Sequence, residues 1–103
     1  MNNPLQKAIK TIVRVAHPDK IILFGSRAKG TAKKNSDYDL LVLKKGIKAQ
    51  RALAHKIYLH FQDIGAPIDV IVTSLKKFEH AKNDPYLIYQ EADKNGKVIY
   101  EKS

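Results

Sequence analysis

A Gly-Ser pair and two closely spaced aspartates are the residues of this chain best suited to chemistry. The pair is Gly25-Ser26, and the acids are Asp37 and Asp39. Side chains alternate along a strand, so the two carboxylates point to one face, about 7 Å apart along the chain. Like charges at this spacing repel or raise one another's pKa, and a divalent cation between them relieves that cost. The spacing therefore predicts a site for a hard cation.

The Gly-Ser pair suits the other half of such a site, a phosphate. Glycine at a strand end lets the backbone approach a phosphate closely, and the Ser26 hydroxyl can hold it together with the amides of a following helical turn. Magnesium favours one or two carboxylates plus the phosphate oxygens of a nucleotide. Each feature alone is also ordinary turn chemistry. In combination they indicate phosphate chemistry.

Apolar runs on both sides place these residues at strand ends. Residues 21–24 and 40–43 each form a short run bounded by turn residues, which is typical of a buried strand. Before them, apolar residues at helical spacing predict a helix over 4–16, which ends ahead of Pro18 because the residue preceding a proline disfavours helix. The first strand leads through Gly25 into a short helix or turn and a polar loop, and the second strand carries the two acids.

After Gly46 the pattern again alternates between helix and strand. A helix between the second and third strands permits their parallel pairing, since such a pair needs a crossover of this length. The predicted elements are a helix over about 48–63, a strand over 68–73, a helix over 75–81 capped by Ser74, a helix from Tyr86 to about Lys94 opened by Asp84-Pro85, and a strand over 97–101.

Two stretches, residues 24–30 and 36–42, resemble the signature of the minimal nucleotidyltransferases, the small branch of the polymerase-beta-like superfamily. Members of that family are about this short and also carry a third acidic strand and a closing hairpin segment. The resemblance implies one nucleotidyltransferase domain over residues 1–103. It also implies an α+β, two-layer palm-like fold with a mixed sheet and helices packed mainly on one face.

The resemblance also implies the roles of the acids. Asp37 and Asp39 would hold two magnesium ions, and Asp69 would complete the second metal site and help to activate the attacking hydroxyl. Asp69 interrupts an apolar strand, where a lone carboxylate is otherwise hard to justify. Asp63 is the rival third acid, near a helix end where it sits comfortably in water. We favour Asp69, because its side chain is expected to point the same way as the other two.

By the same resemblance, Gly25 and Ser26 would bind the triphosphate of ATP. Nearby basic residues would neutralise it, above all Arg27 and Lys29. The four histidines of the chain are too dispersed for a metal cluster. The site predicted from sequence thus consists of three acids, a Gly-Ser turn and two cations.

The function implied is the transfer of AMP from ATP to a hydroxyl, with a tyrosine of a cognate HEPN-type toxin as acceptor, so that the chain is an antitoxin. Two alternatives stay open: a non-catalytic partner that neutralises the toxin by binding, and a nucleic-acid-binding module. Clustered carboxylates destabilise an empty site, so the presence of Ser26 with three acids favours activity. The acids would also repel nucleic-acid phosphates.

Composition agrees with an enzyme of this kind. The chain has 103 residues, a net charge of +9 and no cysteine. That length favours a single core, and the missing cysteines exclude a disulfide framework and a thiolate metal site. Without an apolar run that could span a bilayer or a signal-peptide core, we expect a cytoplasmic protein with no membrane partner. The positive charge can steer a nucleotide or an acidic partner, or attract nucleic acid.

Overall fold

The computed structural model describes residues 3–81 and 88–103, and the predicted helices and strands are all present there with small shifts at their ends. The predicted helix start at 84–86 lies outside the described residues. In chain order the elements are α1 (Pro4–Ala16), β1 (Lys20–Phe24), α2 (Ser26–Lys29), β2 (Tyr38–Leu43), α3 (Gln50–His60), β3 (Ile68–Thr73), α4 (Leu75–Ala81), α5 (Ile88–Asn95) and β4 (Lys97–Glu101).

Helix α1 has the bounds that its sequence pattern predicts. Asn3 caps its start by accepting a hydrogen bond from the amide of Gln6 at 2.8 Å, and Pro4 occupies the first turn, where no backbone donor is needed. His17 ends the helix in the left-handed conformation with φ 48°, and Pro18 follows. The buried side chains of one stripe, including Ala8 and Ile12, face the sheet.

Helix α3 is shorter than the predicted range of 48–63. It begins at Gln50 without a side-chain cap, and it ends at His60 because Phe61 is extended and Asp63 has a positive φ of 51°. Ile57 is fully buried against the sheet.

The four strands form one mixed sheet in the order β3-β2-β1-β4. Strand β1 runs antiparallel to both β2 and β4, whereas β2 and β3 are parallel. The mixed sheet expected from the family resemblance is therefore confirmed, and the parallel pairing that the helical crossover permits occurs within it. Strand β3 is an edge strand, and α3 forms the crossover that leads to it.

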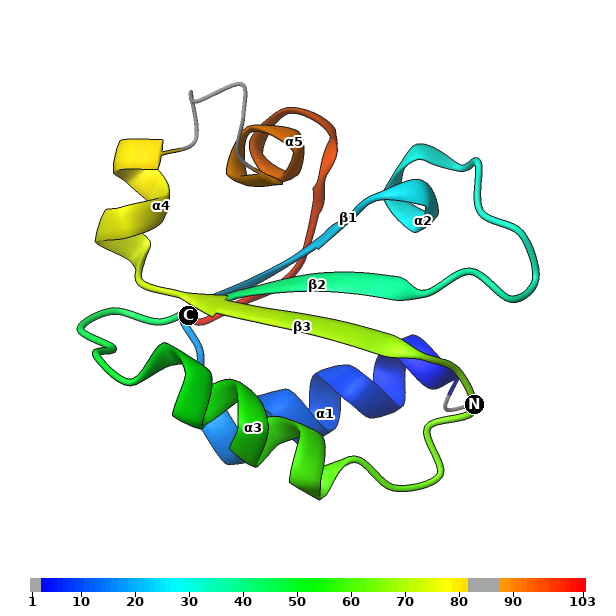
Figure 1. Cartoon of the computed structure of the whole chain (residues 1–103), viewed down its shortest axis with the longest axis horizontal. Coiled ribbons are helices and arrows are strands. Elements are labelled where there is room, and N and C mark those ends of the chain that lie inside the picture. Colours follow the sequence, from blue (N-terminus) through cyan, green and yellow to red (C-terminus); the bar gives the residue numbers. More distant parts are fainter. Residues whose placement is uncertain (1–2, 82–87) are drawn as a thin grey trace.

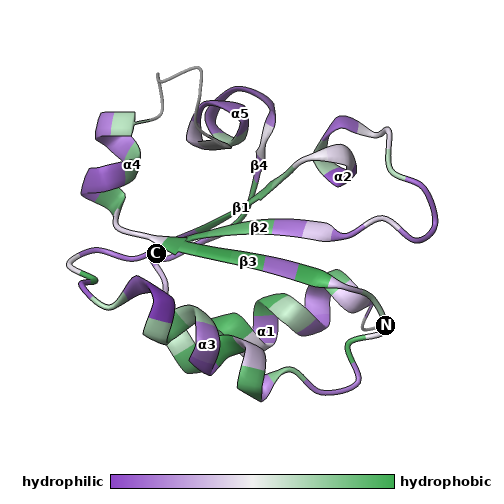
Figure 2. Cartoon of the chain, viewed as in Figure 1, coloured by the Kyte–Doolittle hydropathy of each residue, from purple (hydrophilic) through white to green (hydrophobic). Residues whose placement is uncertain are grey.

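Helices cover both faces of this sheet (Figure 1). The long helices α1 and α3 lie on one face, as predicted, and pack on Leu40 and Val42. The shorter helices α4 and α5 lie on the other face over Leu41 and Leu43. The inner strands carry runs of hydrophobic residues (Figure 2), and these belong to one core on each face of the sheet, so both faces need cover. The α+β class is confirmed, with a second, smaller helical layer added to the predicted one.

No helix in the described part of the chain combines the length and the hydrophobicity needed to cross a bilayer.

Candidate active site

The antiparallel pairing of β1 and β2 brings the Gly-Ser turn beside the first acids. Phe24, at the end of β1, is paired with Asp39, at the start of β2. Gly25 follows with φ 73°, a conformation that L side chains rarely adopt. A Cβ atom on Gly25 would lie 2.3 Å from Oδ2 of Asp39, so the backbone touches the carboxylate. The glycine is therefore required both for its conformation and for this close approach.

The parallel pairing of β2 and β3 brings the third acid to the same place. Asp69 is the register partner of Asp39, so the two side chains lie next to each other on one face of the sheet. Asp37 precedes β2 by one residue and is exposed, as is Asp69, whereas Asp39 is half-buried. The three acids named from the sequence thus gather at one end of two neighbouring strands.

Asp39 is the electrostatic centre of this group. Burial raises the pKa of the Asp39 carboxyl above its ordinary value, and the negative charges of Asp69 and Asp37 raise it further. A bound cation would reverse that effect by favouring the ionised form.

The three acids supply the hard oxygen ligands that Mg²⁺ prefers. No group of three or more His, Cys, Asp or Glu side chains within the described residues is close enough to form a complete metal cage. Magnesium does not require one, because it is usually held by one or two carboxylates together with water and substrate phosphates. Asp39 with one neighbouring acid fits that requirement, and a nucleotide would supply the remaining ligands.

Ser26 opens the short helix α2, which starts directly after Gly25. The Gly25 carbonyl accepts hydrogen bonds from the amides of Ala28 at 3.1 Å and Lys29 at 3.2 Å, which fixes the turn. The first amides of a helical turn have no acceptor inside that turn. Ser26 is half-buried and lies one residue from the Asp39 contact, and its phosphate-binding role stays a prediction.

Arg27 is engaged with the loop that carries the acids. Its guanidinium donates to the Ser36 carbonyl at 2.9 Å and to the Lys34 carbonyl at 3.3 Å, and it stacks 4.2 Å from the centre of the Tyr38 ring. These contacts connect α2 to the loop over 30–37 and fix the backbone of that loop at Ser36, the residue before Asp37. The sequence marked Arg27 as a triphosphate ligand, and this positioning contact was not foreseen.

Lys29 is paired with an acid of a different element. Its Nζ lies 2.7 Å from Oε1 of Glu91 in α5. Hydrogen bonds from Lys29 and then from Asn95 lower the pKa of the Glu91 carboxyl. The pair joins α2 to α5, and the contact of Lys29 with a triphosphate stays a prediction.

The two rival third acids are clearly separated. Asp63 is exposed in the loop before β3, and its carbonyl accepts a hydrogen bond from Nζ of Lys7 on α1. That loop lies on the side of the sheet covered by α1 and α3 (Figure 1). Asp69 is instead in register with Asp39. The choice of Asp69 made from sequence agrees with this placement.

Tyr58 of α3 is a neighbour of the site that the sequence pattern did not reveal. Its hydroxyl lies 3.3 Å from Oδ1 of Asp69 and accepts a hydrogen bond from the Val70 amide at 2.6 Å. Burial raises the pKa of the Tyr58 phenol, the hydrogen bond from Val70 lowers it, and Asp69 raises it again. Tyr58 of α3 reaches Asp69 because β3 is an edge strand whose outer side is open to this helix, and the sequence pattern alone does not show that.

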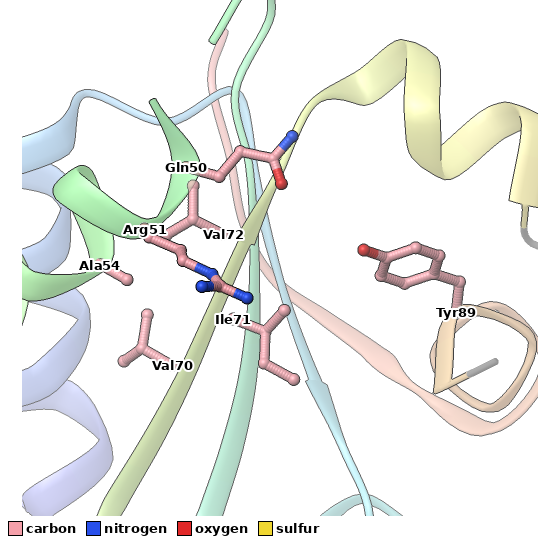
Figure 3. A pocket seen from close by; sticks show the side chains of 7 residues that line it. All are labelled: Gln50, Arg51, Ala54, Val70, Ile71, Val72 and Tyr89. Atoms are coloured by element: carbon pink, nitrogen blue, oxygen red, sulfur yellow. The ribbon is translucent and has the colours of Figure 1, made fainter. Parts of the chain in front are cut away.

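A pocket of about 260 Å³ lies further along the outer edge of β3 (Figure 3). Gln50, Arg51 and Ala54 approach it from the start of α3, and Tyr89 points toward it from α5 across the edge strand. The three acids are not among its lining residues. The hydroxyl of Tyr89 donates to Oγ1 of Thr73 at 3.3 Å, away from the acids. This pocket is distinct from the acid site.

Comparison with known proteins agrees with the geometry. Residues 6–103 match the family described as "Polymerase beta, Nucleotidyltransferase". The chain belongs to this family. A match of that extent covers the Gly-Ser turn and all three acids, so these stand inside a nucleotidyltransferase domain. No curated protein matches the chain.

Solved structures share the nucleotidyltransferase fold. A toxin-antitoxin crystallised with AMP-PNP has 23% identity and a TM-score of 0.56, with 94% of this chain and 73% of that chain covered. A mutant of the toxin-antitoxin MntA-HpeT has 23% identity and a TM-score of 0.62, over 98% and 75% of the two chains. A proposed nucleotidyltransferase from Sulfolobus solfataricus has 19% identity and a TM-score of 0.63, over 96% and 87%.

Proposed function

We propose that this nucleotidyltransferase is a Mg²⁺-dependent protein adenylyltransferase of the cytoplasm, which moves AMP from ATP to a tyrosine of a HEPN-type toxin and so acts as its antitoxin. One observation carries the proposal: the Gly25-Ser26 turn and the acids Asp37, Asp39 and Asp69 lie together at one end of the sheet. A phosphate-binding turn beside hard oxygen ligands is the arrangement that nucleotidyl transfer requires.

The chemistry divides among these residues. Transfer joins the acceptor oxygen to the α-phosphorus and breaks the α–β anhydride bond, so that pyrophosphate leaves. When bound, two magnesium ions would stabilise the attacking and leaving oxygens of this displacement. Gly25 and Ser26 hold the triphosphate in line, and Asp37 and Asp39 provide the metal ligands. Asp69 completes the metal site and takes the proton of the acceptor hydroxyl.

The elements that follow β3 favour a protein as the acceptor, because they cover or extend the sheet. After β3 the described residues form α4, α5 and β4, and these elements cover the second face of the sheet or extend it. The acids are not among the lining residues of the 260 Å³ cavity along β3. We therefore expect the acceptor to bring its own surface to the acids. The toxin-antitoxin assemblies with this fold support a toxin as that partner.

The test is transfer of label from α-labelled ATP, with magnesium, onto proteins that co-purify with the chain. We expect label on a tyrosine of the partner with the wild type and none with the Asp37→Ala/Asp39→Ala double variant. Asp69→Asn should also abolish labelling. Asp63→Asn is the matched control, since it removes the charge of an exposed acid that lies away from the site, and it should label like the wild type.

Other results would point elsewhere. A stable stoichiometric complex without label would indicate neutralisation by binding alone. Equal labelling by Asp69→Asn and the wild type would refute the assignment of the third acid. Rapid transfer onto an unrelated small molecule would contradict the need for a protein partner.

A further inference from the structure

Because β3 is an edge strand, the backbone amide of Val70, next to Asp69, can hydrogen-bond to a side chain instead of to another strand. Strand β3 is paired on one side only, with β2. On its other side the Val70 amide donates a hydrogen bond to the Tyr58 hydroxyl at 2.6 Å. The same hydroxyl lies 3.3 Å from Oδ1 of Asp69 and 3.4 Å from the Val70 carbonyl. One phenol thus contacts both the carboxylate of Asp69 and the residue that follows it.

The hydroxyl and the ring of Tyr58 make different contacts, and only the hydroxyl contacts Asp69. The ring packs edge-to-face on Phe61, with centroids 5.9 Å apart, and a phenylalanine would make that contact equally well. The tyrosine is 40% exposed, so core packing does not explain it. Its hydroxyl bridges from α3, on one face of the sheet, to an acid that points to the other face.

Asp69 needs such a contact more than Asp39 does. Asp39 is half-buried on an inner strand and lies against the Gly25 backbone, so its surroundings limit its rotamers. Asp69 is exposed on the edge strand, where a carboxylate keeps its rotamer freedom unless a neighbour restricts it. A ligand that is fixed before the metal and the acceptor arrive loses less entropy when they bind.

We propose that Tyr58 is a positioning residue for Asp69: its hydroxyl fixes the carboxylate and the adjoining strand edge in the orientation that metal binding and activation of the acceptor require. This inference rests on the proposed function, in which Asp69 completes the second metal site. Partners of metal-ligating carboxylates act in this way elsewhere, and their removal costs about 10–100-fold in metal affinity or activity.

Tyr58→Phe tests the role, because it removes the hydroxyl and keeps the ring. Tyr89→Phe is the matched control: its hydroxyl also makes a 3.3 Å hydrogen bond, to Thr73, but contacts none of the acids. Mn²⁺ binding in the presence of AMP-PNP, followed by electron paramagnetic resonance, reports on the metal site without turnover. Transfer assays separate kcat from the KM for ATP, and thermal melts report on folding.

We expect Tyr58→Phe to lower the affinity of the weaker Mn²⁺ site and the kcat by about 10–100-fold, with the KM for ATP unchanged. Tyr89→Phe should match the wild type in both, with a similarly small change in Tm. Combining Tyr58→Phe with Asp69→Asn should weaken Mn²⁺ binding no further than Asp69→Asn alone, because the tyrosine acts through the acid.

The Mn²⁺ data decide the inference independently of turnover. Wild-type Mn²⁺ binding by Tyr58→Phe would overturn it, and so would an equal loss with Tyr89→Phe. If the wild type transfers no nucleotide, the proposed function fails, but a loss of Mn²⁺ affinity confined to Tyr58→Phe still supports the positioning role.

Discussion

Gly25→Ala is the substitution with the most direct structural consequence for the site. The new Cβ atom would lie 2.3 Å from Oδ2 of Asp39, about 1 Å short of the 3.4 Å of ordinary contact. The carboxylate must therefore retreat by about 1 Å, and a misplacement of that size at a reacting centre can cost about 100-fold in rate. The residue would also sit at φ 73° and ψ −156°, where strain for a non-glycine residue is about 1–3 kcal/mol.

Gly46→Ala separates these two effects. Gly46 has nearly the same φ, 74°, but nothing lies within 4 Å of the position of its Cβ atom. Left-handed strain of about 1–2 kcal/mol should lower the Tm of this variant by about 4–16 °C without impairing chemistry.

The assay is the initial rate of AMP transfer well below the Tm of both variants, with melts in parallel. We expect both variants to lose Tm, Gly25→Ala more because its Cβ atom also overlaps Asp39, with a near wild-type rate for Gly46→Ala and a rate about 100-fold lower for Gly25→Ala. A rate for Gly25→Ala within a few-fold of the wild type would refute the reasoning that Asp39 must stay against the glycine backbone.

Three further substitutions have defined outcomes. Asp39→Asn should abolish both transfer and the rise in Tm that Mg²⁺ causes in the wild type. Because the pKa of Asp39 is raised in the folded state, the metal-free wild type loses stability as the pH rises from 3.8 through that pKa. Without metal, the variant should therefore melt at a higher temperature than the wild type at neutral pH and at the same temperature below pH 3.8. Ser26→Ala loses one hydrogen bond to the charged triphosphate and should raise the KM for ATP by about 10- to 100-fold in steady-state kinetics. Glu91→Gln releases Lys29, so the KM for ATP should fall while the Tm changes little; an unchanged KM would mean that Lys29 does not reach the nucleotide.

The sequence was most informative where local patterns decide structure. Helix α1 and strand β3 have their predicted bounds, because capping residues and hydrophobic periodicity specify them. Resemblance and alternation together also selected Asp69 over Asp63. The end of α3 was less predictable, since Phe61 and Asp63 leave the helix for conformations that periodicity does not encode.

Long-range contacts of polar side chains were beyond sequence reasoning. Arg27 stacks on Tyr38 and bonds to carbonyls of the following loop, and Lys29 pairs with Glu91, 62 positions later in the chain. Proximity to Ser26 in the sequence predicts that both cations bind the triphosphate, but it does not encode these other partners. The contact of Tyr58 with Asp69 depends on β3 being an edge strand, which only the pairing of the strands determines.

The register between β2 and β3, in which Asp39 is paired with Asp69, determines both the packing of the core and the position of the third acid. Val70 and Val72 pack in the core under α1 and α3 while Asp69 faces the other side, so a shift of the strand by one residue would take the valines out of that core and carry the acid to the wrong face. Length changes should therefore be tolerated in the loop over 61–67 and not within Ile68–Thr73. A change that shifts the register of this strand should therefore disturb the packing of the core and the placement of the third acid together.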